Sequence, residues 1–161
     1  MTILTKRIST PRLVLATAIA TGLGLMLAAC SPGLSLSPGL TQQMNKPGAE
    51  LNRVEALFLL NDYRRQQGAP AVRGDSVLDG IAQTLASNYA KTGAQPTLPA
   101  GATVMRLSAG YTTFAEVFSG WRNAPPDAAA ISDPTTSRAG IGVAYEPGSS
   151  LGTYWVLVLA Q

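Results

Sequence analysis

Few side chains of this chain could do chemistry, because the sequence contains no histidine and only one cysteine, Cys30. Without histidine it lacks the usual general base at neutral pH and the commonest transition-metal ligand. Acid–base chemistry would then fall to the nine Asp and Glu residues, and Glu116 and Asp127 are one pair among them. They could act as a pair only if they converge in one pocket and one of them has a raised pKa.

Cys30 ends the tetrapeptide Leu27-Ala28-Ala29-Cys30, which follows a basic start and an apolar run over residues 13–29. This order is that of an export signal over residues 1–29. A cysteine directly after two alanines resembles the lipobox of bacterial lipoproteins. The resemblance implies cleavage before Cys30 and attachment of acyl chains to it. Two other interpretations are an ordinary secretory signal with an incidental cysteine, and a single membrane-spanning helix, for which the run is short.

Removal of the signal changes the charge balance. Lys6, Arg7 and Arg12 leave with it, so nine basic residues face nine acidic ones. This balance predicts no nucleic-acid partner, because such a partner needs a clustered basic surface. The remaining chain is long enough for one domain, and with its only thiol acylated it forms no internal disulfide.

Residues 30–49 are predicted to tether that domain, which would span residues 50–161. The tetrapeptide Ser-Pro-Gly-Leu occurs twice here, at 31–34 and 37–40. Proline and glycine interrupt the segment too often for a helix or a central strand. Its leucines could instead lie along the surface of the domain.

Two helices are predicted in the first half of the domain. Apolar residues at three- and four-residue steps, among them Leu51, Val54 and Leu57, predict a helix that ends at Gly68. A second helix is expected to begin near Asp75 or Ser76 and to end at Gly93. Ser76 and Asp79 have the spacing of a capping box for it.

A third helix and a terminal hairpin complete the expected fold. The sequence Thr113-Phe114-Ala115-Glu116 is a capping box, and Pro125-Pro126 would end the helix that it opens. A short strand or an extended segment is expected over residues 103–109, and strands over 139–145 and 154–159. The last is apolar enough to be central and covered on both faces. Helices followed by an antiparallel hairpin indicate an α+β fold.

Several segments in this order resemble the CAP superfamily, whose domain is also called SCP. They are Leu57 to Arg64, Ile81-Ala82-Gln83, Ser108 to Tyr111, Glu116 to Asn123, Arg138 to Tyr145 and Tyr154 to Ala160. The resemblance covers about residues 51–161. It implies a three-layer α-β-α sandwich with a small antiparallel sheet.

The resemblance also implies a cleft with two histidines and two acidic residues, and here the chain departs from it. Thr92-Gly93-Ala94-Gln95 stand where the first histidine would follow the second helix. Met105 and Arg106 replace a Glu-Asn pair, and Asp127 replaces the second histidine. Glu116 is a remnant of the second acidic position.

The candidate cleft residues are therefore Met105, Glu116 and Asp127, and the site is degenerate. No catalytic residue, metal ligand or cofactor is assigned, since two carboxylates do not make a transition-metal site. Each carboxylate also has a purely structural interpretation: Glu116 as a capping residue, and Asp127 as a solvated loop residue. Trp121 and Trp155 are expected in the core.

These observations predict an envelope lipoprotein, held at a membrane by acyl chains on Cys30, whose CAP domain binds a lipid, glycan or protein partner without turnover. Ser31 after the cysteine favours the outer membrane, facing the periplasm. One alternative is a hydrolase of an envelope substrate that uses Glu116 and Asp127. The other is a structural protein with no cleft ligand.

Overall fold

The computed structural model describes residues 36–161. The expected signal peptide and Cys30 lie outside these residues. The elements in chain order are α1 (Pro38–Thr41), α2 (Arg53–Gln66), β1 (Arg73–Gly74), α3 (Ser76–Thr92), β2 (Val104–Ala109), α4 (Phe114–Asn123), α5 (Pro125–Ile131), β3 (Arg138–Tyr145) and β4 (Thr153–Ala160). Among the described helices none is both long and apolar enough to cross a membrane.

Strand β4 is central, as its unbroken apolar run predicts. All eight of its residues are buried, and it pairs antiparallel with both β3 and β2. The sheet order is β1-β3-β4-β2. The sheet is mixed rather than purely antiparallel, because Arg73 and Gly74, for which no strand was predicted, form the short strand β1 parallel to β3. Two residues carry too little periodicity to predict a strand.

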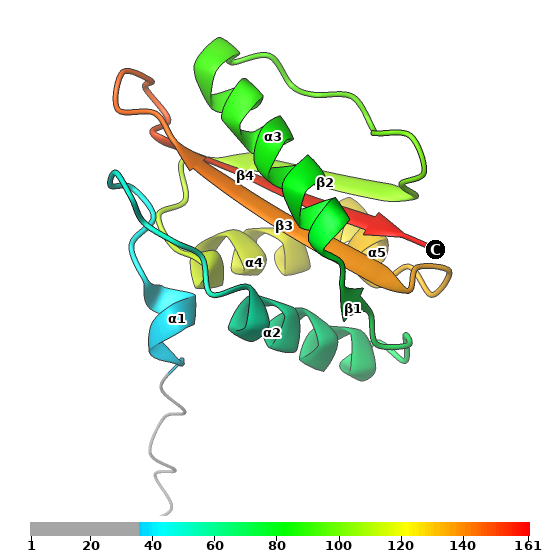
Figure 1. Cartoon of the computed structure of the whole chain (residues 1–161). Coiled ribbons are helices and arrows are strands. Elements are labelled where there is room, and N and C mark those ends of the chain that lie inside the picture. The colour runs from blue at the N-terminus through cyan, green and yellow to red at the C-terminus, as the bar shows by residue number, and fades with distance from the viewer. Residues whose placement is uncertain (1–35) are drawn as a thin grey trace, which may run out of the picture. The chain divides into compact units, whose positions relative to one another are not determined.

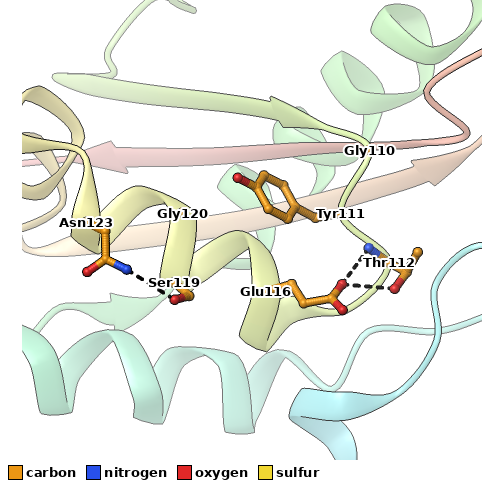
Figure 2. A pocket seen from close by; sticks show the side chains of 7 residues that line it. All are labelled: Gly110, Tyr111, Thr112, Glu116, Ser119, Gly120 and Asn123. Atoms are coloured by element: carbon orange, nitrogen blue, oxygen red, sulfur yellow. Dashed lines mark hydrogen bonds between the residues drawn. The ribbon is translucent and has the colours of Figure 1, made fainter.

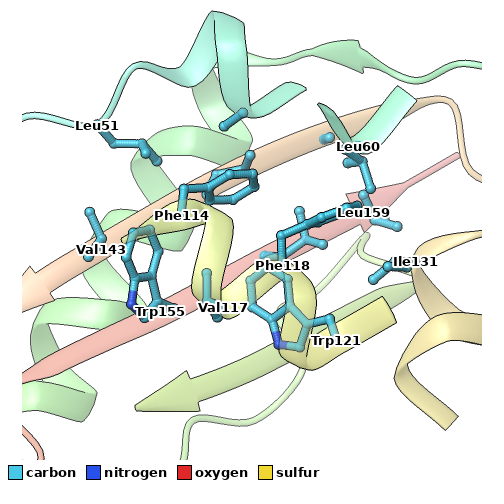
Figure 3. Packing of buried hydrophobic residues seen from close by; sticks show 14 of the residues in the cluster. Leu51, Leu60, Phe114, Val117, Phe118, Trp121, Ile131, Val143, Trp155 and Leu159 are labelled. Atoms are coloured by element: carbon cyan, nitrogen blue, oxygen red, sulfur yellow. The ribbon is translucent and has the colours of Figure 1, made fainter. Parts of the chain in front are cut away.

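Helices cover both faces of the sheet, which confirms the three-layer sandwich (Figure 1). Helix α3 packs on one face through Leu78, Ala82 and Ala86, against Val156 and Val158. Helices α2, α4 and α5 cover the other face, where the larger core lies (Figure 3). This larger core includes the expected core residues Trp121 and Trp155.

The helix ends follow local sequence signals, with one correction. Thr113 and Glu116 form the predicted capping box of α4, and Gly93 ends α3 with a left-handed backbone. The predicted capping box of α3 is wrong. Asp75 accepts the hydrogen bonds of the first turn, whereas the Asp79 carboxylate accepts one from the backbone of Ile141 in β3. The proline pair ends α4 and also begins α5, because proline is tolerated in a first helical turn.

The buried face of α2 differs from the predicted one. Val54 and Phe58 are largely exposed, whereas Ala56, Leu60 and Arg64 are buried. The apolar periodicity was misleading here because a small alanine and a hydrogen-bonded arginine occupy the buried side.

Much of the segment expected to be a tether packs on the domain. Leu40 in α1 and Met44 are buried in the larger core. The Met44 backbone N–H donates to the Thr112 carbonyl at 2.7 Å. The folded unit therefore includes residues 36–49, which the sequence assigned to the tether.

Candidate functional site

An open groove of about 630 Å³ runs between the loop after β2 and the outward face of α4. Its lining residues are Gly110, Tyr111, Thr112, Glu116, Ser119, Gly120 and Asn123 (Figure 2). Four of them lie on α4 at three- and four-residue steps, which places them on one side of that helix. The groove therefore depends on how the loop 110–112 is held above α4.

The core holds this loop in place. Gly110 has a φ of 89°, a left-handed conformation that glycine adopts without strain. The indole Nε1 of buried Trp155 donates a hydrogen bond to the Tyr111 carbonyl at 2.8 Å. The Tyr111 ring lies over Gly120, where a Cβ atom would come within 2.7 Å of the tyrosine hydroxyl. Because Gly120 has no side chain, the ring rests on the helix and is still 37% exposed.

Glu116 lines the groove, but its carboxylate is occupied. One oxygen accepts hydrogen bonds from the Thr112 backbone and hydroxyl, both at 2.9 Å, and from the Thr113 backbone at 3.0 Å. The Thr112 hydroxyl and these N–H groups lower the pKa of Glu116. A carboxylate with a lowered pKa is ionised at neutral pH and is a poor general acid.

Ser119 and Asn123 supply the other polar groups. The Asn123 amide nitrogen lies 3.3 Å from the Ser119 hydroxyl, to which it donates (Figure 2). The amide oxygen of Asn123 accepts no hydrogen bond within the described chain. The groove thus presents hydroxyl, amide and carboxylate oxygens beside an aromatic ring.

Asp127 does not line this groove. It lies in the first turn of α5, where one carboxylate oxygen is 3.1 Å from Nε of Arg106 on β2. That buried Nε makes no hydrogen bond, so the contact is an ion pair without an aligned hydrogen bond. The Arg106 guanidinium also reaches the Pro126 carbonyl. Asp127 is thus a paired carboxylate between β2 and α5.

Met105 lies on the other face of the sheet. It packs with Leu78, Ala82 and Ala86 in the core beneath α3. Neighbouring side chains of a strand point to opposite faces, so Arg106 faces the α5 side and Met105 cannot. The structure therefore does not bring the three sequence candidates together. Glu116 caps α4 in the groove, Asp127 is paired with Arg106, and Met105 lies on the other face of the sheet.

A family model for CAP, described as the cysteine-rich secretory protein family, matches residues 57–159. The chain belongs to this family. No curated protein sequence matches the chain.

Several solved structures have a fold similar to that of this chain. The CAP domain is similar to the crystal structure of MpPR-1i soaked with selenourea, with a TM-score of 0.56 and 19% identity over 66% of this chain and 88% of that one. An outer surface protein from Borrelia burgdorferi is similar with a TM-score of 0.54 and 14% identity, over 65% of this chain and 89% of that one. An extracellular protein containing a SCP domain from Bacillus anthracis is similar with a TM-score of 0.55 and 14% identity, over 67% of this chain and 40% of that one. At these identities the likeness establishes the fold alone.

Two histidines and two acidic residues, as the family resemblance implies for the cleft, could hold a divalent metal, and the residues of this CAP domain do not fit one. Within residues 36–161 no three His, Cys, Asp or Glu side chains gather at one place. At the expected ligand positions, Met105 lies behind the sheet, and the cationic Arg106 pairs with Asp127. Arg106 beside the Asp127 carboxylate repels a metal ion and competes for the carboxylate oxygens. The other acidic position, Glu116, uses one carboxylate oxygen to cap α4.

Sequence reasoning missed Tyr111, Ser119 and Asn123 as groove residues. The available signal was the spacing of Glu116, Ser119, Gly120 and Asn123, which places them on one helix face. The opposite face of α4 carries the apolar residues Phe114, Val117, Phe118 and Trp121, so exposure of the polar face was predictable. The groove was not, because it depends on how the loop 110–112 lies beside the helix.

Proposed function

We propose that this protein is a membrane-anchored envelope lipoprotein whose CAP domain binds a glycan in the groove beside Tyr111 and does not transform it. The anchor is the acylated Cys30, for which the tetrapeptide ending at that residue and the basic, apolar segment before it are the support. Two or more acyl chains at one residue anchor a protein stably, whereas one chain is marginal. Ser31 favours the outer membrane, with the domain in the periplasm.

The observation that carries the binding role is the chemistry of the groove. An exposed tyrosine ring lies beside hydroxyl and amide groups, and the one lining carboxylate, Glu116, is ionised and caps α4 through one of its oxygens. An aromatic ring packs on the apolar face of a sugar, and polar groups around it fix the orientation of its hydroxyls. The groove therefore favours a hydroxyl-rich ligand.

A lipid fits this groove less well than a glycan. Sites that bury an apolar ligand are concave and are lined mainly by hydrophobic side chains. Here the only large apolar group among the lining residues is the Tyr111 ring, and the groove is open to solvent. A protein partner would need a larger surface than these seven residues supply.

The hydrolase alternative lacks the arrangement that it requires. Glu116 caps α4 and has a lowered pKa, whereas a general acid needs a raised one. Asp127 is held by Arg106 and is absent from the groove lining. The two carboxylates thus have separate structural partners.

The names of two structural neighbours support an envelope location. One is an outer surface protein and the other an extracellular protein. The same location is expected for a chain with an export signal.

The binding role is tested by titrating the purified full-length protein in detergent with soluble peptidoglycan fragments. Native protein should bind, and Tyr111→Ala should weaken binding about tenfold, since it removes the stacking platform. Tyr145→Ala is the matched control, because Tyr145 is a half-buried tyrosine outside the groove and should leave binding unchanged. Equal binding by native protein and Tyr111→Ala, or hydrolysis of the fragments that Asp127→Asn abolishes, would contradict the proposal.

A further inference from the structure

Helix α2 carries two large apolar side chains on its outward face. Val54 is 79% exposed and Phe58 is 71% exposed. They are four residues apart, so they lie on the same side of the helix, one turn from each other. Together they form an apolar patch in the first half of α2, where no described element covers them.

The chain joins the domain beside this patch. Ser37 donates a hydrogen bond to the Glu55 carboxylate in the first turn of α2, and α1 packs against α2 (Figure 1). Leu36, directly before Ser37, is itself 51% exposed. Three exposed apolar side chains therefore occur where the upstream chain meets the folded domain.

The distance from the expected anchor to this region is short. Leu36 follows Cys30 by six residues. Six residues span at most about 20 Å, and a domain of this size has a radius of gyration of about 14 Å. Acyl chains on Cys30 would thus keep the α1–α2 side of the domain within about 20 Å of the bilayer surface.

The charged neighbours of the patch are engaged within the protein. Arg53 Nε donates to the Ile141 carbonyl at 3.0 Å and lies 3.5 Å from Asp79. The Glu55 carboxylate accepts the hydrogen bond from Ser37. Removing water from an unpaired charge would oppose contact with lipid. Because Arg53 and Glu55 already have partners, contact between the patch and lipid does not carry this cost.

We propose that α2 lies against the bilayer, with Val54 and Phe58 inserted at the boundary between headgroups and acyl chains and Leu36 beside them. The acyl chains supply the stable attachment, and the apolar side chains add a second contact that sets how the domain lies on the membrane. This inference rests on the proposed anchoring at Cys30. Helix α3, on the opposite face of the sheet, then faces away from the lipid.

The test uses the acylated full-length protein in vesicles of phosphatidylethanolamine and phosphatidylglycerol. With Cys30 acylated, a Phe58→Cys variant has one free thiol, which is labelled with an environment-sensitive fluorophore. Nitroxide-labelled lipids should quench this label about twofold or more, because it enters the headgroup–acyl boundary. Val54→Cys, labelled in the same way, is a second reporter in case the change at residue 58 disturbs the patch.

Val77→Cys is the matched control. Val77 is also an exposed apolar residue, at 68%, but it lies on α3. Strong quenching at residues 54 and 58 and little at residue 77 supports the docked orientation. If the protein still floats with the vesicles, equal quenching at all three positions, or none at any of them, overturns the docked orientation. Loss of flotation because no acyl chain is attached refutes the anchoring, and the docking with it.

Discussion

Arg64 has no exposed surface although it carries a charge. Its guanidinium donates to four backbone carbonyls, those of Pro70, Ile131, Asp133 and Thr136, at 2.8–3.2 Å. Burial lowers its pKa, and the charge of Asp133 partly opposes this effect. Arg64 therefore links the end of α2 to the loop after α5, and so helps to position α5 with Asp127.

We expect Arg64→Met to lower the free energy of unfolding by about 3 kcal/mol or more, because it leaves buried carbonyls without donors. Denaturant unfolding measures this difference. Arg65→Met is the matched control: Arg65 is exposed and pairs only with Asp62 on the same helix, so its loss should cost less than about 1 kcal/mol. Equal effects of the two substitutions would contradict the role given to Arg64.

At the scale of elements, the contact between α3 and β3 depends on two glycines. A Cβ atom at Gly140 would overlap the backbone of Leu78, and one at Gly142 would overlap the backbone of Ala82. Because backbone atoms cannot move aside as the end of a side chain can, any larger residue must separate helix from sheet. The alternation of small and large residues along β3 thus sets how closely α3 approaches.

Gly142→Ala should therefore destabilise the domain by about 1–3 kcal/mol or more through overpacking. Gly80→Ala is a sharp contrast, since Gly80 lies inside α3 and a Cβ there meets nothing within 4 Å. It should stabilise the domain by about 0.5–1 kcal/mol, because alanine loses less backbone freedom on folding. Thermal unfolding of both variants checks this pair, and stabilisation by Gly142→Ala would refute the packing described.

The parts of the fold that sequence could predict are those fixed by local signals. The capping box at Thr113 and Glu116 and the apolar run of β4 depend on neighbours in the chain, and both are confirmed. The buried face of α2 was not predictable by periodicity, because Phe58 is apolar yet exposed. Likewise, the partner of Asp127 is Arg106, 21 positions upstream, and only the folded sheet brings them together.

At the scale of the whole molecule, the described chain is a CAP domain with an upstream addition. The family model begins at residue 57, whereas Leu40, Met44 and Leu51 upstream of it are also in the core. The upstream segment reaches the groove as well, since Met44 bonds to Thr112 in the loop that lines it. The apolar patch on α2 and the groove beside α4 therefore lie in the same folded domain, which includes the segment from Leu36.

The claim that links the proposed anchoring to the proposed docking of α2 is that Cys30 carries acyl chains. Cells that produce native protein or Cys30→Ser are grown with labelled palmitate, and the purified chains are compared. Native protein should carry the label, and Cys30→Ser should carry none, since the serine has no thiol for the first acyl-bearing group. Equal labelling of the two, or no label on native protein, would contradict the account.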